Sequence, residues 1–204
     1  MLPVEKFLIQ EPAYCAGFCL PPLSLGTYLI LCDRESAYVS GDWESTTGER
    51  AFNEMVMALT FCRVGYDVAH KILANPDGRD FDQATRETGA AIVAADSNIV
   101  SVSETFSAWW YNQTEVPEIE PLQVESAENV GTEFALRLLA SATRILGIDY
   151  QKAIYAPYGL LLRAHVHDME ERGHCRLLTD ERKEQIALAI EQTEQQAQQD
   201  AQES

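Results

Sequence analysis

The chain has 204 residues, of which 32 are acidic and 15 basic, so its formal charge is −17. Its hydrophobic fraction of 46% excludes a wholly disordered chain and is enough for one core. A field of this sign repels phosphates and anionic membrane surfaces, which argues against direct nucleic-acid or membrane binding and favours basic protein partners. The plainer reading of the charge is that it keeps the protein soluble.

Two further features bear on membrane insertion and redox compartment. No uninterrupted apolar run reaches the ~18 residues that a membrane span needs. Five cysteines are scattered without the spacing of a disulfide framework, and no signal-peptide pattern precedes them. We therefore expect free thiols and a cytoplasmic location.

The pattern divides the chain into three parts. Prolines and a glycine forbid a long helix in residues 1–22, where we expect an N-terminal extended arm or a hairpin, with residues 4–9 as a weak strand. Residues 23–194 are expected to form a single helical domain, whose last helix is capped by Thr179. The glutamine- and glutamate-rich residues 195–204 have nothing to bury, so we expect a disordered tail there.

Helical spacing with local start and stop signals predicts the first half of that domain. Ser24 caps a strongly apolar helix that should be central. Thr46 and Glu49 have the spacing of a capping box for the next helix. Gly65 interrupts this second helix, so we expect either two helices or one kinked helix.

Turn residues and apolar spacing define the next two elements. A turn over residues 75–78 ends the interrupted helix, and Asp80 caps a further, alanine-rich helix. Residues 98–111 permit either a strand or a helix by composition. We favour a helix that begins near Ser101 or Ser103, because its large apolar residues recur three and four positions apart.

Trp109, Trp110 and Tyr111 are adjacent on that helix. Neighbouring residues of a helix point about 100° apart, so the three side chains fan over about 200° and at least one must reach the surface. Trp and Tyr are enriched in interface hot spots, so we assign these three as candidate partner-binding residues. Simple partial burial is the plainer alternative. Residues 114–125 should then form a loop.

The longest consistent pattern covers residues 130–173. An amphipathic helix ends at Gly147, Asp149 caps a short turn, and Pro157 opens a helix that ends at Gly173. Taken together, the elements predict an all-α domain, a compact multi-helix bundle with a short N-terminal arm.

His165, His167, Asp168, His174 and Cys175 have the residue types of a zinc site. Residues two apart on a helix point about 200° away from each other, so His165 and His167 cannot share one ion there. We expect His165 at the core boundary, His167 in solvent, and no bound metal.

The motifs of common enzyme classes do not occur in the sequence. It contains no GxSxG turn, no phosphate-binding loop and no GxGxxG. Cys15 and Cys19 are spaced CxxxC, but Gly17 and nearby prolines disfavour the helix that would place both thiols on one face. We expect no catalytic residue, no cofactor and no enzymatic activity.

Four segments carry a resemblance: residues 21–31 (PPLSLGTYLIL), 58–73 (ALTFCRVGYDVAHKIL), 106–121 (FSAWWYNQTEVPEIEP) and 146–173 (LGIDYQKAIYAPYGLLLRAHVHDMEERG). In this order they resemble the tail assembly chaperones of bacteriophages, small helical proteins encoded with the tail genes. The resemblance implies a non-enzymatic helper, in the host-cell cytoplasm, that holds a long, aggregation-prone tail protein such as the tape measure during virion morphogenesis. The high acidity and the glutamine-rich tail depart from the family.

The alternative class is an acidic inhibitor that mimics the charge of DNA and blocks a host nucleic-acid-binding protein. It needs rows of carboxylates at about a phosphate spacing on one face, whereas a chaperone needs an exposed apolar groove with acidic rims. A metal-dependent enzyme built around His165 and His174 ranks third. Whether the chain forms homo-oligomers stays open.

Overall fold

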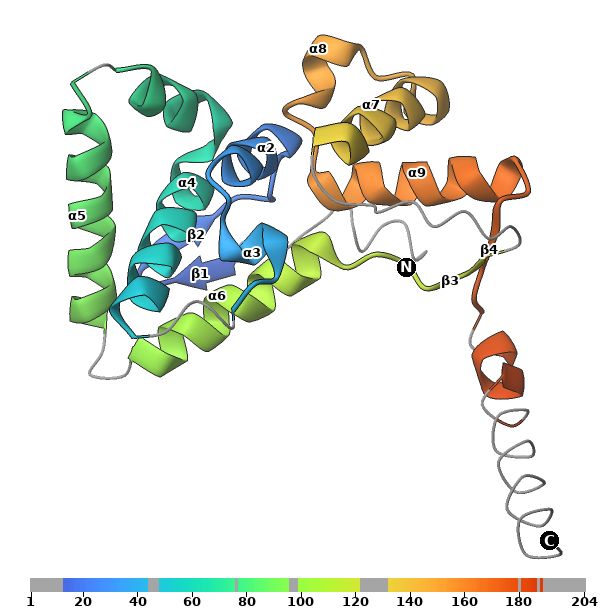
Figure 1. The fold of residues 1–204 in the computed structure, drawn as a ribbon, viewed down its shortest axis with the longest axis horizontal. Coiled ribbons are helices and arrows are strands. Elements are labelled where there is room, and N and C mark those ends of the chain that lie inside the picture. Colours follow the sequence, from blue (N-terminus) through green and yellow to red (C-terminus); the bar gives the residue numbers. More distant parts are fainter. Residues whose placement is uncertain are drawn as a thin grey trace, which may run out of the picture. The chain divides into compact units, whose positions relative to one another are not determined.

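A computed structural model describes residues 13–43, 48–75, 77–95, 99–121, 132–179, 181–186 and 188. Helices dominate these residues, and strands occur in them only as two short two-stranded sheets (Figure 1). The mainly helical character expected from the sequence is confirmed. The expected strand at residues 4–9 and the expected tail at residues 195–204 lie outside the described part.

The contacts divide the chain into two compact units. Of the described residues, the main unit comprises those up to Val116 together with 132–165, and the small unit comprises 117–121 together with those from Val166 onward. The single helical domain expected over residues 23–194 spans parts of both units and stays a prediction. Periodicity reports which face of each helix is apolar, but it does not report which apolar faces share one core.

The main unit begins with a hairpin of β1 (Ala13–Cys15) and β2 (Phe18–Leu20), which pair in antiparallel fashion. Ala16 and Gly17, at the turn, both have positive φ, as a type I′ hairpin turn requires. Cys15 and Leu20 are buried. Of the two forms expected for this segment, the hairpin is confirmed, and it packs on the core instead of extending as an arm.

Helix α2 (Leu25–Asp33) is central, as expected. The Ser24 hydroxyl accepts a hydrogen bond from the backbone N–H of Thr27 at 3.2 Å, which confirms the predicted cap. Leu25 and Leu31 are fully buried. The short α3 (Ala37–Ser40) follows, and the backbone N–H of Ala37 donates to the Glu54 carboxylate at 3.0 Å.

Helix α4 (Glu49–Ala74) is interrupted at Gly65, whose backbone (φ 73°, ψ 172°) is not helical, so the predicted kink is confirmed. The predicted capping box is wrong, because Gly48 is the N-cap and Glu49 is the first helical residue instead of the third. Thr46 itself lies outside the described residues. After the kink, the ring of Tyr66 packs directly on Gly26.

Helix α5 (Arg79–Ala95) lies beside α4 (Figure 1). It begins before Asp80, so the prediction that Asp80 is its cap is wrong; the Asp80 carboxylate instead accepts from the Asn75 side chain at 2.9 Å. Between the two helices, the hydroxyls of Thr60 and Thr88 lie 2.8 Å apart, and Arg63 Nε donates to Thr88 at 3.0 Å.

Helix α6 (Ile99–Thr114) confirms the helical prediction, although it starts a little earlier than Ser101. Helix α7 (Thr132–Leu146) ends at Gly147, which has positive φ, and the Asp149 carboxylate caps α8 (Tyr150–Ala153) by accepting from Gln151 N at 2.8 Å. Both terminal signals are therefore confirmed.

Helix α9 (Tyr158–Glu171) follows Pro157, as predicted, and its first turn is tied to the chain before α2. Tyr158 N donates to the Leu23 carbonyl at 2.7 Å, and Gly26 N donates to the Ile154 carbonyl at 2.8 Å. The start of α2 and the corner between α8 and α9 therefore satisfy each other's backbone groups.

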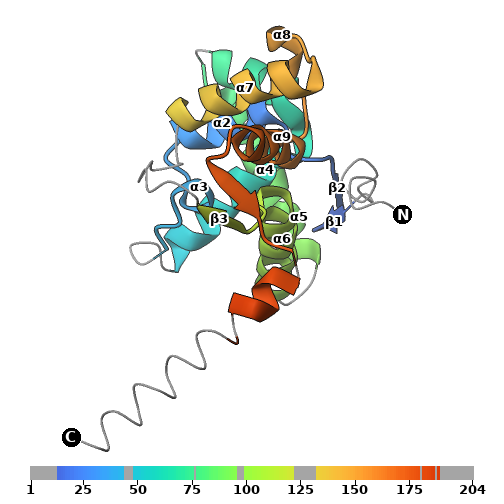
Figure 2. The same ribbon diagram turned by 90° about the vertical axis from the view of Figure 1, so that its right-hand side faces the viewer.

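The small unit contains an antiparallel pair of β3 (Ile119–Pro121) and β4 (Cys175–Leu177). Figure 2 shows β4 leading from the end of α9 to the helical residues 181–186. Gly173, with positive φ, ends α9 as predicted, and the Thr179 hydroxyl accepts from Arg182 N at 3.3 Å as a cap. Strand β3 was missed, because the sequence analysis assigned residues 114–125 to a loop.

Candidate functional site

Trp109 and Trp110 are core residues. Each is only 7% exposed, whereas Tyr111 is 64% exposed. Trp109 stacks on Phe106 at 5.6 Å between ring centroids, and Trp110 lies 5.6 Å from the ring of Tyr38. Of the three candidate partner-binding residues, only Tyr111 is exposed, and the two tryptophans are corrected to core positions. Because each residue advances about 100° around the helix, the side chain of Tyr111 lies outside the face of α6 that packs on the core.

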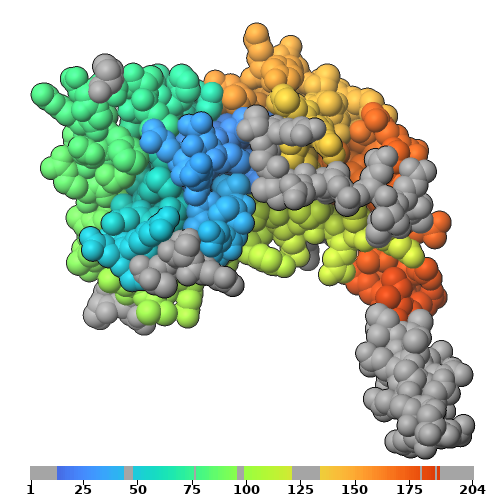
Figure 3. All heavy atoms as spheres, in the orientation of Figure 1, coloured from blue at the N-terminus to red at the C-terminus, as the bar shows by residue number. Residues whose placement is uncertain are grey.

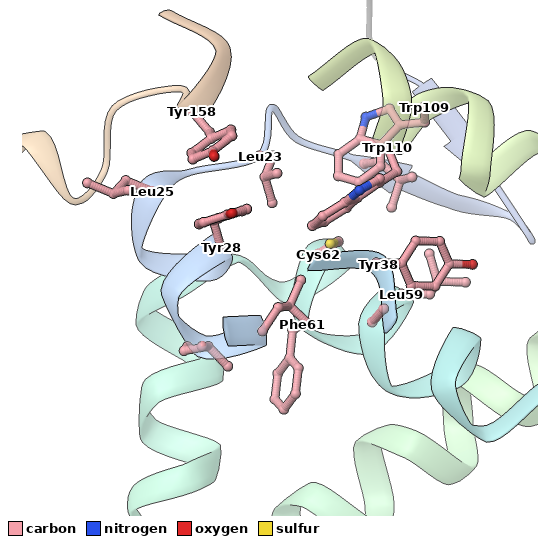
Figure 4. Packing of buried hydrophobic residues seen from close by; sticks show 14 of the residues in the cluster. Leu23, Leu25, Tyr28, Tyr38, Leu59, Phe61, Cys62, Trp109, Trp110 and Tyr158 are labelled. Atoms are coloured by element: carbon pink, nitrogen blue, oxygen red, sulfur yellow. The ribbon is translucent and has the colours of Figure 1, made fainter. Parts of the chain in front are cut away.

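Two tyrosines and a cysteine lie in the aromatic cluster around these tryptophans (Figure 4). Tyr28 and Tyr158 stack at 4.0 Å between ring centroids. Burial raises the pKa of Tyr28 to about 12 and also raises the pKa of Tyr158, so both phenols stay protonated. Burial likewise raises the pKa of the Cys62 thiol, which stays neutral among these rings. These groups are therefore packing residues.

The histidines do not gather around an ion site. Ser141 Oγ lies 2.9 Å from His165 Nδ1, and the ring of His165 meets Phe134 edge-on at 5.7 Å. His167 is exposed, and its Nε2 lies 3.6 Å from a Glu171 carboxylate oxygen. Within the described ranges, no group of three or more His, Cys, Asp or Glu side chains is arranged to hold a metal. His165 lies at the core boundary and His167 in solvent, as expected.

Cys15 and Cys19 lie on opposite faces of the hairpin. Cys15 is buried and pairs in register with Phe18, whereas Cys19 is exposed and pairs with Tyr14. Burial raises the pKa of the Cys15 thiol to about 11. The CxxxC spacing therefore does not bring two reactive thiols together.

An open groove of about 610 Å³ lies between α4 and α5. Figure 3 shows the atoms of α5, in green, against those of α4, in cyan. Nine residues line this α4–α5 groove: Phe52, Asn53, Val56, Thr85, Arg86, Gly89, Ala90, Val93 and Ala94. Most of them are apolar, and Val93 is 63% exposed. The groove is therefore an apolar surface that the described residues leave uncovered.

Small side chains on α5 create the groove. Gly89, Ala90 and Ala94 leave a depression, whereas Ala84, Thr88 and other residues on the opposite side of α5 are buried. A Cβ on Gly89 would reach Val56 only at 3.9 Å, so there is free space above that glycine. The sequence showed that this helix is alanine-rich, but it could not show which face α4 would cover.

Charged residues lie in and near the α4–α5 groove. Glu49 is exposed one helical turn before Phe52 on α4, and Asp82 is exposed one turn before Arg86 on α5. Arg86 is the one charged residue among the described lining residues, and its Nε donates to the Asp82 carbonyl at 3.0 Å. Helical spacing therefore puts one exposed acidic residue a turn beyond the lining residues of each helix, while the charged residue that lines the groove itself is Arg86.

Comparisons of the chain with protein-family models, with curated proteins and with solved structures found no match. None of the described helices combines the length and the apolar character needed to cross a membrane.

Proposed function

We propose that the protein is a non-enzymatic, chaperone-like binding protein that holds an apolar helical segment of a partner protein in the α4–α5 groove. The carrying observation is that this groove is open and largely apolar. This is the role of the phage tail assembly chaperones that four of its segments resemble. Its partner would be a tape-measure-type tail protein, held in the host-cell cytoplasm.

The volume of the groove is large enough to receive apolar side chains of a client. Its volume of about 610 Å³ falls within the roughly 300–1,000 Å³ of ordinary ligand sites. A client helix can place side chains three and four positions apart into such a trough, which is how grooves between helices bind amphipathic segments. An aggregation-prone client has apolar stripes of this kind to protect.

The charges favour a client with basic flanks. Glu49 and Asp82 each lie one helical turn beyond the lining residues of the groove, and the whole chain carries −17. Lysine or arginine residues beside the apolar stripe of a client helix would meet both carboxylates. Electrostatic attraction would raise the association rate, while burial of apolar surface would supply most of the affinity.

The test uses two valines of nearly equal exposure. Val93 lies in the groove and is 63% exposed; Val100 lies on α6, outside the residues that line the groove, and is 60% exposed. Aggregation of a purified tape-measure-type tail protein is followed by light scattering with the wild type, Val93→Glu and Val100→Glu. We expect the wild type and Val100→Glu to suppress aggregation, and Val93→Glu to need at least about tenfold more protein.

Two outcomes would contradict the proposal. Equal protection by Val93→Glu and Val100→Glu would remove the groove from the function. Inhibition of a DNA-binding protein, with no protection of the tail protein by the wild type, would support the acidic-inhibitor alternative instead. Circular-dichroism spectra of both variants check that each is folded.

A further inference from the structure

A second cavity, of about 450 Å³, surrounds the kink of α4 at Gly65. Three segments of the main unit form its walls: Pro21 and Pro22 before α2, Cys62 with residues 64–68 around the kink, and Tyr155 with Pro157 between α8 and α9. We call this cavity the kink pocket. It does not share a lining residue with the α4–α5 groove.

The backbone at the kink keeps the pocket open. Gly65 adopts a φ of 73°, which side chains of L-residues disfavour, and the chain turns there. Tyr66 then packs its ring on Gly26, and its centroid lies 5.7 Å from that of Tyr155 in an edge-to-face arrangement. Both tyrosines are therefore held at the wall by contacts with other elements.

One carboxylate stands at the pocket. Asp67 is exposed, and the Tyr155 hydroxyl donates a hydrogen bond to its Oδ1 at 3.0 Å. This hydrogen bond and the charge of Asp67 raise the pKa of Tyr155, so the phenol remains a donor near neutral pH and orients the carboxylate. Among the described lining residues, Asp67 is the only charged one.

These features select a positively charged guest. An anion would be repelled by Asp67 and by the −17 charge of the chain, and an apolar guest would desolvate the carboxylate without replacing its hydrogen bonds. A cation on a flexible apolar stem matches both the apolar walls of the pocket and the Asp67 carboxylate. Its methylenes contact the prolines, and its charge meets Asp67 beside the ring of Tyr155, which is 55% exposed.

From this geometry we infer that the kink pocket binds an arginine side chain presented by a protein partner. Arginine fits better than lysine, because its planar guanidinium can pair with the carboxylate and stack on a phenol ring at the same time. On α4, Arg63 lies four residues before Asp67, where Thr88 and the ring of Phe18 hold its guanidinium, and Lys71 lies four residues after it. Lys152 lies on α8, three residues before Tyr155. The two lysines are exposed and can move aside in water.

The first experiment titrates the ¹⁵N-labelled full chain with N-acetyl-arginine methylamide and with its neutral analogue N-acetyl-citrulline methylamide. We expect saturable shifts of the Gly65, Tyr66 and Asp67 amide signals with the arginine compound, at a dissociation constant of about 1 mM. The citrulline compound should bind at least about tenfold more weakly. Equal binding of the two compounds, or no saturable shift at these amides, would overturn the inference.

Two substitutions test which side chains of the kink pocket bind the arginine compound. Asp67→Asn should abolish the difference between the arginine and citrulline compounds, and Tyr155→Phe should weaken arginine binding several-fold. Asp77→Asn, an exposed aspartate outside the residues that line the pocket, is the matched control and should bind as the wild type does. Binding by Asp67→Asn at wild-type strength would rule out the carboxylate as the determinant.

A third arm identifies the source of the cation. A capped Leu-Arg-Leu peptide should bind more tightly than agmatine, because the flanking leucines add contacts with the apolar walls. Agmatine binding as tightly as the peptide would assign the pocket to a small free cation and overturn the protein-partner part of the inference. Val93→Glu should leave all of these titrations unchanged, so failure here is distinguishable from failure of the groove proposal.

Discussion

In the main unit the largest side chains are buried against one another, whereas in the small unit two three-residue strands are flanked by ion pairs near the surface. Phe61, Phe106 and Leu138 are fully buried in the main unit. In the small unit, Arg182 lies 3.1 Å from Glu120, and Lys183 lies 2.7 Å from Glu118. The comparison shows that one chain can combine a core stabilised by the burial of apolar side chains with a segment held by ion pairs that solvent and salt screen.

The reason is the amount of apolar surface that each unit can remove from water. The main unit packs several helices around a continuous aromatic and aliphatic cluster. The described residues of the small unit form one end of α9, two short strands and a few helical residues, and Val166 and Cys175 are among their buried apolar side chains. A unit of that size gains little from burial, so its surface pairs carry a larger share of its stability.

The largest effect is expected for Phe106→Ala. Phe106 is fully buried between Trp109 and Tyr38, so its loss leaves a cavity and should lower the free energy of unfolding by about 3–5 kcal/mol. Denaturant titration monitored by tryptophan fluorescence and circular dichroism measures the change. Tyr111→Ala, on the same helix but exposed, should stay within about 0.5 kcal/mol of the wild type. Similar losses in both variants would show that the aromatic cluster is not the core.

A smaller difference in unfolding free energy is expected between alanine substitutions at two helical glycines, Gly26 and Gly89. A Cβ at position 26 would overlap the ring of Tyr66, so Gly26→Ala should cost about 1–3 kcal/mol of unfolding free energy. A Cβ at position 89 meets only Val56, at 3.9 Å, so Gly89→Ala should be neutral or stabilising by up to about 1 kcal/mol. Thermal melts of the two variants provide the measurement. Destabilisation by Gly89→Ala would mean that α4 and α5 pack more closely than described.

In the small unit, Arg182→Gln should loosen the pairing of β3 with β4 while leaving the main unit unchanged. Arg182 is hydrogen-bonded to Glu120, which is paired in register with Arg176 on β4. Hydrogen exchange of the amides of β4 should speed up in the variant. High salt should produce a similar but weaker change in the wild type, because it screens the exposed pair. If neither the substitution nor high salt changes the exchange rates of the β4 amides, the small unit is not stabilised by this ion pair.

The smallest expected effect is a pH dependence confined to the small unit. The hydrogen bond from Arg182 and its charge lower the pKa of Glu120 below its ordinary value of 4.5. Because the folded pKa is depressed, this stabilisation is complete above that ordinary value and is lost as the pH falls through the folded pKa. Exchange at β4 should therefore accelerate on acidification below 4.5, and Glu120→Gln should flatten the response. An identical acid response in Glu120→Gln would assign it to other carboxylates.

Local signals predicted helix ends well where the chain itself provides the hydrogen-bond partner. Ser24, Asp149 and Thr179 each accept a backbone N–H two or three residues ahead, and Gly147 and Gly173 adopt the positive φ that ends a helix. These interactions need nothing beyond the neighbouring residues. The prediction of Asp80 as a cap was wrong because α5 begins before it, with Asp82 N donating to the carbonyl of Gly78.

Surfaces were predicted less well than helices. Trp109, Trp110 and Tyr111 were proposed together, but packing against Phe106, Tyr38 and Tyr28 takes both tryptophans out of contact with partners. The α4–α5 groove and the kink pocket were not proposed at all. Each is formed by residues far apart in the sequence, so no local pattern marks it.

The sequence by itself determined the helical class, the kink at Gly65 and most helix ends, because side-chain periodicity, caps and glycine conformations act over a few residues. Tertiary structure alone decided which apolar faces meet, which aromatic rings stay exposed, and where β3 finds its partner across more than fifty residues. It also decided that Phe52 and Val93 line the same groove and that Asp67 accepts a hydrogen bond from the Tyr155 hydroxyl. Such contacts depend on the free energy of burying whole faces together, which is a property of pairs of elements and not of any one segment.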